Sequence, residues 1–313
     1  MDAAAASTPA TPATPSTRPS PLPTLFLSHG SPMIALEPRE AGHFMVELGR
    51  TIEARFGRPR ALLVASAHTL TREPVLLAAP RHEAIYDFGG FDPKLETLRY
   101  DAPGAPELAA RVATLLHGAG LPAHVVDAGG LDHGIWTALR YLWPAADVPV
   151  LPLGWPPNWP PAKLMTLGRA LAPLAAEGVL VVGSGAITHN LRRVFAGGLR
   201  PATEAPVTPE SRDFRDWFAA RGAAADWAAL RDYRAQAPHG VLMHPTDEHL
   251  LPFFVAAGAA SGHDAEGDAD PGPALRVHAS FTHGDLGMDA YAFGAAAGAL
   301  ASALPARPQP MQG

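Results

Sequence analysis

Three histidines in this sequence come after apolar runs that are typical of buried β-strands. His29 and His68 follow such runs directly, and His189 follows a β-branched run by a short Gly-rich segment. In open α/β sheets, ligands bind in the crevice outside the carboxyl ends of the strands, so these side chains can share one site. Imidazole suits iron, zinc, copper and nickel. One histidine after a strand is more often an ordinary loop residue, but three at one edge indicate a shared metal or catalytic site.

His249 is a further candidate ligand. Thr246 is predicted to cap a helix that runs from Asp247 to about Ala257, which puts His249 in the first helical turn. Acidic residues in a first turn complement the helix dipole, which gives Asp247 and Glu248 a structural explanation. Alternatively, a carboxylate there completes a two-histidine, one-carboxylate site of the non-haem iron type.

His133 lies in the Gly-flanked loop 129–134, which follows a short predicted strand and leads into a helix. It is either a site residue or an ordinary loop histidine. The remaining histidines lack a motif context or flank a late strand, and we interpret them as structural: His43, His117, His124, His263, His278 and His283.

The elements that position these residues alternate along the chain. Strands are predicted at 24–27, 61–65, 74–78, 123–126, 148–153, 179–182, 275–281 and 289–293, and helices at 41–56, 106–117, 135–142, 162–176, 209–220, 223–237 and 247–257. Continuous apolar strands are typical of sheets covered on both faces. The prediction is a single-domain α/β fold, with a mostly parallel central sheet flanked by helices on both faces, over residues 23–303. The Ala/Thr/Ser/Pro-rich segment 1–22 and the segment 304–313 are predicted to be disordered tails.

The composition excludes several classes of protein. The chain has no cysteine, so any metal must be held by imidazole and oxygen, and a cysteine nucleophile is excluded. A net charge of -6 provides no basic field for nucleic acid or an anionic membrane. No apolar run reaches the roughly 18 residues of a membrane span, and no secretory signal precedes the domain. A cytoplasmic protein is therefore predicted.

Six segments together resemble the class III extradiol ring-cleavage dioxygenases, and most closely their DOPA 4,5-dioxygenase-like branch. They are 26–32 (FLSHGSP), 66–68 (SAH), 86–91 (YDFGGF), 131–134 (LDHG), 183–191 (GSGAITHNL) and 245–252 (PTDEHLLP). The resemblance runs in order from about Leu22 to Gly294.

The resemblance implies a role for each site histidine. His29, His68 and His249 would bind the metal, and His189 would be the acid/base residue or a fourth ligand. His133 would be catalytic, stabilising the oxygenated intermediate, and His133 and His244 would contact the substrate. Better-studied relatives use a glutamate where this chain has His249, and an all-histidine triad is neutral in charge and would suit zinc as well as iron. Thr69 stands where many relatives have an aromatic residue.

The implied reaction is insertion of both atoms of O2 into a catechol-type ring, DOPA or another catechol, to give a ring-opened semialdehyde. It requires one divalent metal, Fe(II) for activity, with Zn(II) as a possible occupant that cannot perform the redox step. Two alternatives stay open: a zinc-dependent hydrolase, in which the metal lowers the pKa of bound water, and a non-catalytic metal-binding relative. The expected partners are the catechol and O2, without nucleic acid or membrane, and the chain is expected to be a monomer or small homo-oligomer.

Overall fold

The centre of the computed structural model, which describes residues 21–196, 205–261 and 270–305, is one eight-stranded sheet. Its strands are β1 (Thr24–Ser28), β2 (Ala61–Ser66), β3 (Val75–Leu77), β6 (His124–Val126), β7 (Val150–Gly154), β8 (Val179–Gly185), β9 (Leu275–His278) and β12 (Ala290–Phe293). Their order across the sheet is β6-β3-β7-β2-β8-β1-β12-β9. Two small hairpin-like sheets pair β4 (Arg81–His82) with β5 (Ala102–Pro103), and β10 (Phe281–Thr282) with β11 (Leu286–Gly287).

Parallel pairing dominates the middle of the sheet. The neighbours β7, β2, β8 and β1 are parallel, as are β3 and β6, whereas β3 pairs antiparallel with β7, and β12 with β1 and β9. The four central strands are buried along their whole length, as expected for strands covered on both faces. The predicted α/β fold with a mostly parallel sheet is confirmed, and the antiparallel pairs lie toward its edges.

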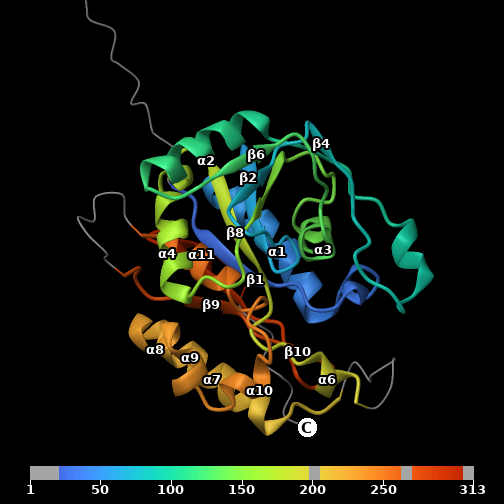
Figure 1. The fold of residues 1–313 in the computed structure, drawn as a ribbon. Coiled ribbons are helices and arrows are strands. Elements are labelled where there is room, and N and C mark those ends of the chain that lie inside the picture. The colour runs from blue at the N-terminus through green and yellow to red at the C-terminus, as the bar shows by residue number, and fades with distance from the viewer. Residues whose placement is uncertain (1–20, 197–204, 262–269, 306–313) are drawn as a thin grey trace, which may run out of the picture.

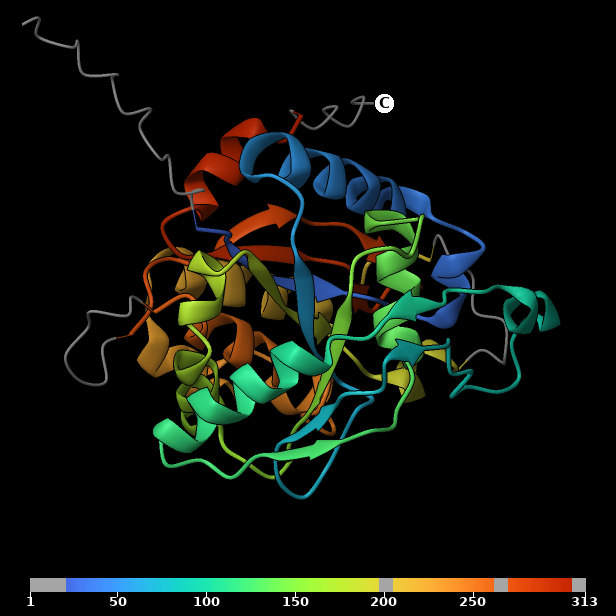
Figure 2. The same cartoon turned by 90° about the horizontal axis from the view of Figure 1, so that it is seen from above.

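Helices cover both faces of the sheet (Figures 1 and 2). One face carries α1 (Arg39–Phe56), α3 (His133–Leu142) and α12 (Ala297–Ala303); the other carries α2 (Pro106–Gly118), α4 (Pro161–Ala170) and α11 (Pro252–Gly258). Figure 2 shows α1 and α12 side by side over their face. Successive side chains of a strand point to opposite faces, so Leu62 and Val64 enter one core while Leu63 enters the other.

Two predicted helices are each divided in the structure. The predicted helix 162–176 is α4 followed by α5 (Pro173–Ala176), because Pro173 has no N–H to continue the helix. The second, predicted over 223–237, consists of two short helices, α8 (Trp227–Arg231) and α9 (Tyr233–Gln236), which follow α7 (Pro209–Ala223). Here the Asp226 carboxylate accepts the N–H of Ala229 and starts a new helix. The C-terminal α12 was not predicted.

The prediction of a helix that begins at Asp247 is wrong. Residues 246–251 form bends and turns, and α11 begins at Pro252, where a proline is favoured because its missing N–H would have no partner in the first turn. The Thr246 hydroxyl donates to Glu248 at 3.0 Å instead of capping a helix. Asp247 accepts hydrogen bonds from Tyr233 and Arg234. The helix-dipole explanation of the acidic pair therefore does not apply.

Short elements surround the edge of the sheet at which β1, β2 and β8 end. They are the 3-10 helices η1 (Pro32–Ala35) and η2 (Pro93–Thr97) and the single-turn helices α6 (Leu191–Val194) and α10 (Gly240–Met243). None of the helices within residues 21–196, 205–261 and 270–305 combines the length and hydropathy of a bilayer-crossing segment. The predicted tails fall almost entirely outside the described residues. At the inner end of the first, Leu22 is buried and donates its N–H to the carbonyl of Ala175.

Candidate metal centre

Two parallel strands on either side of β8 bring the first two predicted ligands together. β1 and β2 both pair with β8, so their carboxyl ends lie at one edge of the sheet. His29 and His68 follow those ends, and the N–H of His29 donates to the carbonyl of Gly185 at the end of β8. Strand ladders fix the backbone positions, and the histidine side chains then extend into the crevice beyond them.

The turn that carries His249 is attached to the same edge. The N–H of Ala186 donates to the carbonyl of His249 at 2.8 Å, and the N–H of His189 donates to the carbonyl of Met243 at 2.9 Å. Gly185 lies so close to the turn that a Cβ there would stand 2.0 Å from the His249 carbonyl oxygen. Only glycine permits this approach, so the Gly-rich segment after β8 is what admits the turn.

The ring centroids of His29, His68 and His249 lie close to one another. The separations are 5.1 Å between His29 and His68, 5.4 Å between His29 and His249, and 4.9 Å between His68 and His249. Two sets of possible ligand atoms, each within 4.8 Å of one another, occur among the described residues. We call them the strand-end cluster (His29, His68, His133) and the turn cluster (His189, Glu248, His249).

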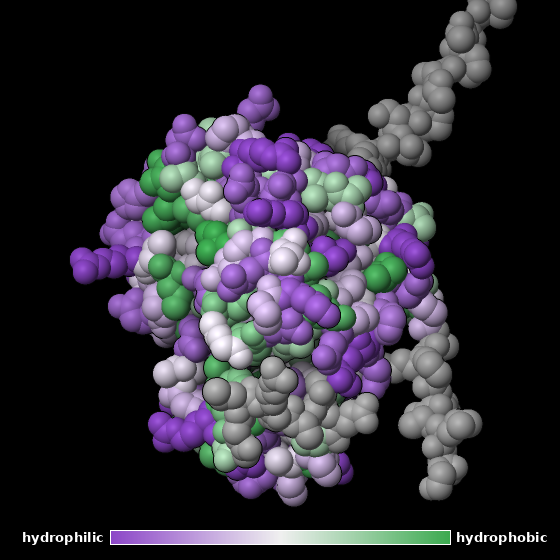
Figure 3. Space-filling view, turned by 90° about the vertical axis from the view of Figure 1, so that its right-hand side faces the viewer, coloured by the Kyte–Doolittle hydropathy of each residue, from purple (hydrophilic) through white to green (hydrophobic). Residues whose placement is uncertain are grey.

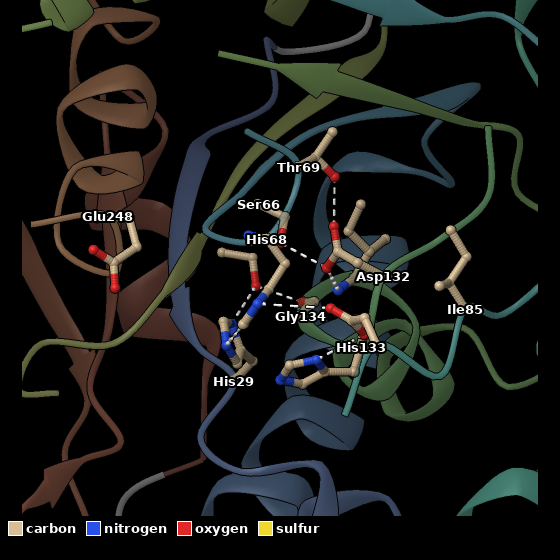
Figure 4. A network of polar contacts seen from close by, with 12 residues as sticks. His29, Ser66, His68, Thr69, Ile85, Asp132, His133, Gly134 and Glu248 are labelled. Atoms are coloured by element: carbon tan, nitrogen blue, oxygen red, sulfur yellow. Dashed lines mark hydrogen bonds and ion pairs between the residues drawn. The ribbon is translucent and has the colours of Figure 1, made fainter. Parts of the chain in front are cut away.

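His133 joins the strand-end cluster from the start of α3. Asp132 caps that helix by accepting the N–H of Ile135, and it also accepts hydrogen bonds from the hydroxyls of Ser66 and Thr69. These bonds tie the helix start to the end of β2. Figure 4 shows the rings of His29, His68 and His133 directed toward one another, whereas Glu248 comes from a separate segment. Thr69 therefore contributes to holding Asp132.

Hydrogen bonds at Nδ1 of His29 and His249 leave Nε2 of each ring available to bind a metal. Nδ1 of His29 lies 3.0 Å from the hydroxyl of Ser184, which itself donates to the carbonyl of Gly134 and so accepts from the imidazole. Nδ1 of His249 donates to Glu248 at 3.1 Å. An acceptor on one ring nitrogen is the usual way in which a metal-ligating histidine is oriented.

The separation of two Nε2 atoms tests whether these residues fit a metal. Nε2 of His29 and Nε2 of His68 are 3.2 Å apart. The Asp87 carboxylate lies 3.6 Å from Nδ1 of His68 and favours the proton on that nitrogen, so both Nε2 atoms present lone pairs to one point. Two nitrogens that each bind one ion at about 2.0–2.1 Å stand roughly 3 Å apart. The donor set therefore fits a divalent cation.

Burial keeps the clustered imidazoles neutral. It is the largest cause that lowers the pKa of His29 well below its ordinary value, with His68 the next cause. Burial likewise lowers the pKa of His68 to about 4 and, followed by the effect of His189, lowers the pKa of His249 well below its ordinary value. Neutral imidazole is the form that binds a metal, so these side chains are in the ligand form at neutral pH.

His189 belongs to the turn cluster and lies against His249. Its ring stacks on that of His249 with centroids 3.4 Å apart and planes inclined by 8°. Burial, and then His244, lower the pKa of His189 to about 3. Its neighbour Thr188 donates to the carbonyl of Asp285, and Asn190 donates to the carbonyl of Leu242. The position of His189 is therefore set by contacts on both sides along the chain.

A cavity of about 500 Å³ opens beside these rings. Four of the candidate histidines line it: His68, His133, His189 and His249. Apolar side chains supply much of the remaining wall, including Phe88, Phe91, Leu191, Phe195 and Leu286. Leu191 and Val194 of α6, at the lower right of Figure 1, belong to this wall. Figure 3 views the right-hand side of the molecule in Figure 1, where hydrophobic patches are separated by hydrophilic ones. The cavity suits a planar aromatic molecule with polar substituents.

His244 does not line the cavity. It is fully buried, its Nε2 donates to the carbonyl of Ile187 at 2.7 Å, and its ring lies 5.4 Å from that of Phe214. A direct contact with substrate stays a prediction. In this position the His244 side chain supports the backbone just before His189.

The sequence patterns did not identify four residues of the site: Asp87, Ser184, Glu248 as a partner of His249, and His283. Ser184 and Asp87 lie within segments that carried the family resemblance, and that was the available signal. His283, interpreted as structural, lines the cavity. Its placement depends on β10 and β11, which are too short to show a sequence pattern.

Comparisons with known proteins identify relatives of this chain. The family model described as the catalytic LigB subunit of aromatic ring-opening dioxygenase matches residues 23–272. The chain is 36% identical over 272 residues to a 4,5-DOPA dioxygenase extradiol of Beta vulgaris, covering 86% of this chain and 96% of that protein. It is 36% identical over 249 residues to the Escherichia coli K12 protein of the same name, covering 78% and 87%.

A solved structure is similar over nearly the same range. The crystal structure of an uncharacterized Escherichia coli K12 protein superimposes with a TM-score of 0.67 at 30% sequence identity, covering 87% of this chain and 100% of that chain. The predicted resemblance is thereby confirmed. The chain belongs to the LigB family of extradiol aromatic ring-opening dioxygenases.

Proposed function

We propose that this enzyme cleaves a catechol outside its two hydroxyl groups, with one Fe(II) held by His29, His68 and His249. The observation that carries the proposal is the pair of Nε2 atoms 3.2 Å apart, with His249 completing a triangle of rings beside an aromatic-lined cavity. Fe(II) bound there would supply the redox chemistry with O2 and would ease deprotonation of a catechol hydroxyl.

His189 and His133 would handle protons in this reaction. The neutral ring of His189 can accept the proton of a catechol hydroxyl and return it later in the cycle, as a general base and then acid. Nδ1 of His133 donates to Asp87 at 2.9 Å, so its Nε2 is left to contact the substrate and oxygen. In the overall reaction one ring C–C bond breaks, and both oxygen atoms of O2 enter the product, a semialdehyde.

A DOPA-like catechol is the proposed substrate class, because relatives at 36% identity bear that name. The cavity walls of Phe88, Phe91 and Phe195 suit the faces of an aromatic ring. A cytoplasmic location remains part of this proposal.

Oxygen uptake by metal-loaded protein tests the proposal. The protein is purified without oxygen, freed of metal, and loaded separately with Fe(II) or Zn(II). Each form is then given O2 and a panel of catechols that includes DOPA. We expect the Fe(II) form to consume one O2 for each catechol and to generate a new semialdehyde absorbance. Catechol cleavage by the Zn(II) form would contradict the proposal, and so would a failure of the Fe(II) form to cleave any catechol. Ester hydrolysis by the Zn(II) form would favour the hydrolase alternative.

A further inference from the structure

Asp87 lies where the wall of the cavity meets the strand-end cluster. It belongs to the loop between β4 and η2, and its side chain is 25% exposed. The loop is held against the start of α3, since the N–H of Ile85 donates to the carbonyl of Leu131 at 2.7 Å and Nε1 of Trp136 donates to the carbonyl of Ile85 at 3.1 Å. Asp87 is therefore a carboxylate on a firmly attached segment.

One carboxylate faces two imidazoles. Oδ1 of Asp87 accepts both the backbone N–H of His133, at 3.0 Å, and Nδ1–H of His133, at 2.9 Å. Oδ2 lies 3.6 Å from Nδ1 of His68. The centroids of the two rings are 4.0 Å apart. We propose that Asp87 is a positioning residue that fixes the tautomer and orientation of His133 and His68 together.

The physical reason is that an ionised carboxylate can only accept hydrogen bonds. An imidazole whose Nδ1 faces this carboxylate keeps its proton on Nδ1, so the lone pair is on Nε2 and points away from Asp87. For His68 that lone pair would face the metal, and for His133 it would face the cavity. His29 and His249 have separate partners, in Ser184 and Glu248. Only His68 and His133 share one, so Asp87 links a candidate ligand to a candidate catalytic residue. This inference rests on the proposed function for the roles of those two histidines.

The first measurement needs neither metal nor turnover. The tautomers of His133 and His68 are read from 15N chemical shifts of the imidazole nitrogens in metal-free wild type, Asp87→Asn and Asp87→Ala. We expect Nδ1–H in the wild type and a shift of the proton toward Nε2 in Asp87→Ala. Glu73→Gln is the matched control, because Glu73 forms an exposed 2.6 Å pair with His124 that involves none of the site histidines, and its loss is expected to leave the shifts of His133 unchanged. An unchanged Nδ1–H on His133 in both Asp87 variants overturns the proposal.

The second measurement distinguishes a positioning role of Asp87 from a purely structural one. With Fe(II) and a catechol cleaved by the wild type, Asp87→Asn is expected to lower kcat on the order of 10²–10⁴-fold while KM changes far less, since acid–base help is lost and binding area is kept. Asp87→Glu keeps the charge and recovers part of kcat. A kcat for Asp87→Asn equal to that of Glu73→Gln overturns the proposal. If the wild type cleaves no catechol, the proposed function fails, and the tautomer shifts still test Asp87 by themselves.

Discussion

The strand-end cluster and the turn cluster present the same kind of side chain on different supports. His29 and His68 extend from β1 and β2, which pair in parallel with β8 on its two sides, so that the strand ladders fix the backbone. His249 belongs to a turn that depends on single backbone bonds, such as the one from Ala186 to its carbonyl. The partners differ too: a neutral hydroxyl orients His29, whereas the Glu248 carboxylate orients His249. The rigid edge of the sheet thus holds one half of the site, and a packed turn completes it.

Removing a ligand from the strand-end cluster should have the largest effect. His29→Ala and His68→Ala are expected to lose the metal, and turnover with it, because each removes one of the two Nε2 atoms that stand 3.2 Å apart. Metal stoichiometry and oxygen uptake measured on the same preparations check this. His124→Ala, at an exposed histidine on β6, should match the wild type. A metal content near that of the wild type in His29→Ala would show that the other imidazoles suffice.

His189→Ala distinguishes a catalyst from a ligand within the turn cluster. We expect this variant to keep its iron and to bind catechol, but to lose about 10²–10⁴-fold in kcat, the usual contribution of a general acid–base group. Iron stoichiometry, catechol binding by difference spectroscopy and kcat are compared with those of His249→Ala, which should lose the metal. Should His189→Ala be as metal-free as His249→Ala, His189 is a ligand.

Glu248→Gln tests how much the turn depends on its carboxylate. The variant keeps the size of the side chain but weakens the hydrogen bond that orients His249, so metal affinity should fall about 10–100-fold. Titration of the metal-free protein with Co(II), followed by its visible spectrum, measures the change. The comparison is Ser184→Ala, which removes the neutral partner of His29. If Ser184→Ala lowered the metal affinity more than Glu248→Gln does, the expectation that the turn cluster depends more on its hydrogen-bond partner would be wrong.

Thr69→Val should have the smallest effect. It removes one of the two hydroxyls that donate to Asp132 but leaves the Ser66 hydroxyl and the backbone N–H of Ile135 in place. We expect the free energy of unfolding to fall by about 1 kcal/mol, as for one lost hydrogen bond. Urea unfolding of metal-free protein measures it, and Thr114→Val, an exposed threonine of α2, is the control. Equal stability of the two variants would mean that Thr69 contributes nothing to the attachment of α3.

Strand-end placement was the part of the site that could be predicted. His29 and His68 follow continuous apolar runs, and such runs identify buried strands because both of their faces are covered. The helix predicted at Asp247 failed for a tertiary reason. Tyr233 and Arg234 bind the Asp247 side chain, and Pro252 starts α11 later. The ring of His249 lies near those of His29 and His68 even so, because the turn places it at the edge that the helix was expected to reach.

The sequence by itself determined the chemistry of the donors and the type of sheet. With no cysteine, only imidazole and oxygen remain as ligands, and the apolar runs fix which histidines follow strands. The tertiary structure alone decided the convergence of His249 and the sharing of Asp87 between His68 and His133. Local patterns encode strands because the side-chain period is local, whereas contacts between distant segments depend on packing and on close approaches such as that at Gly185.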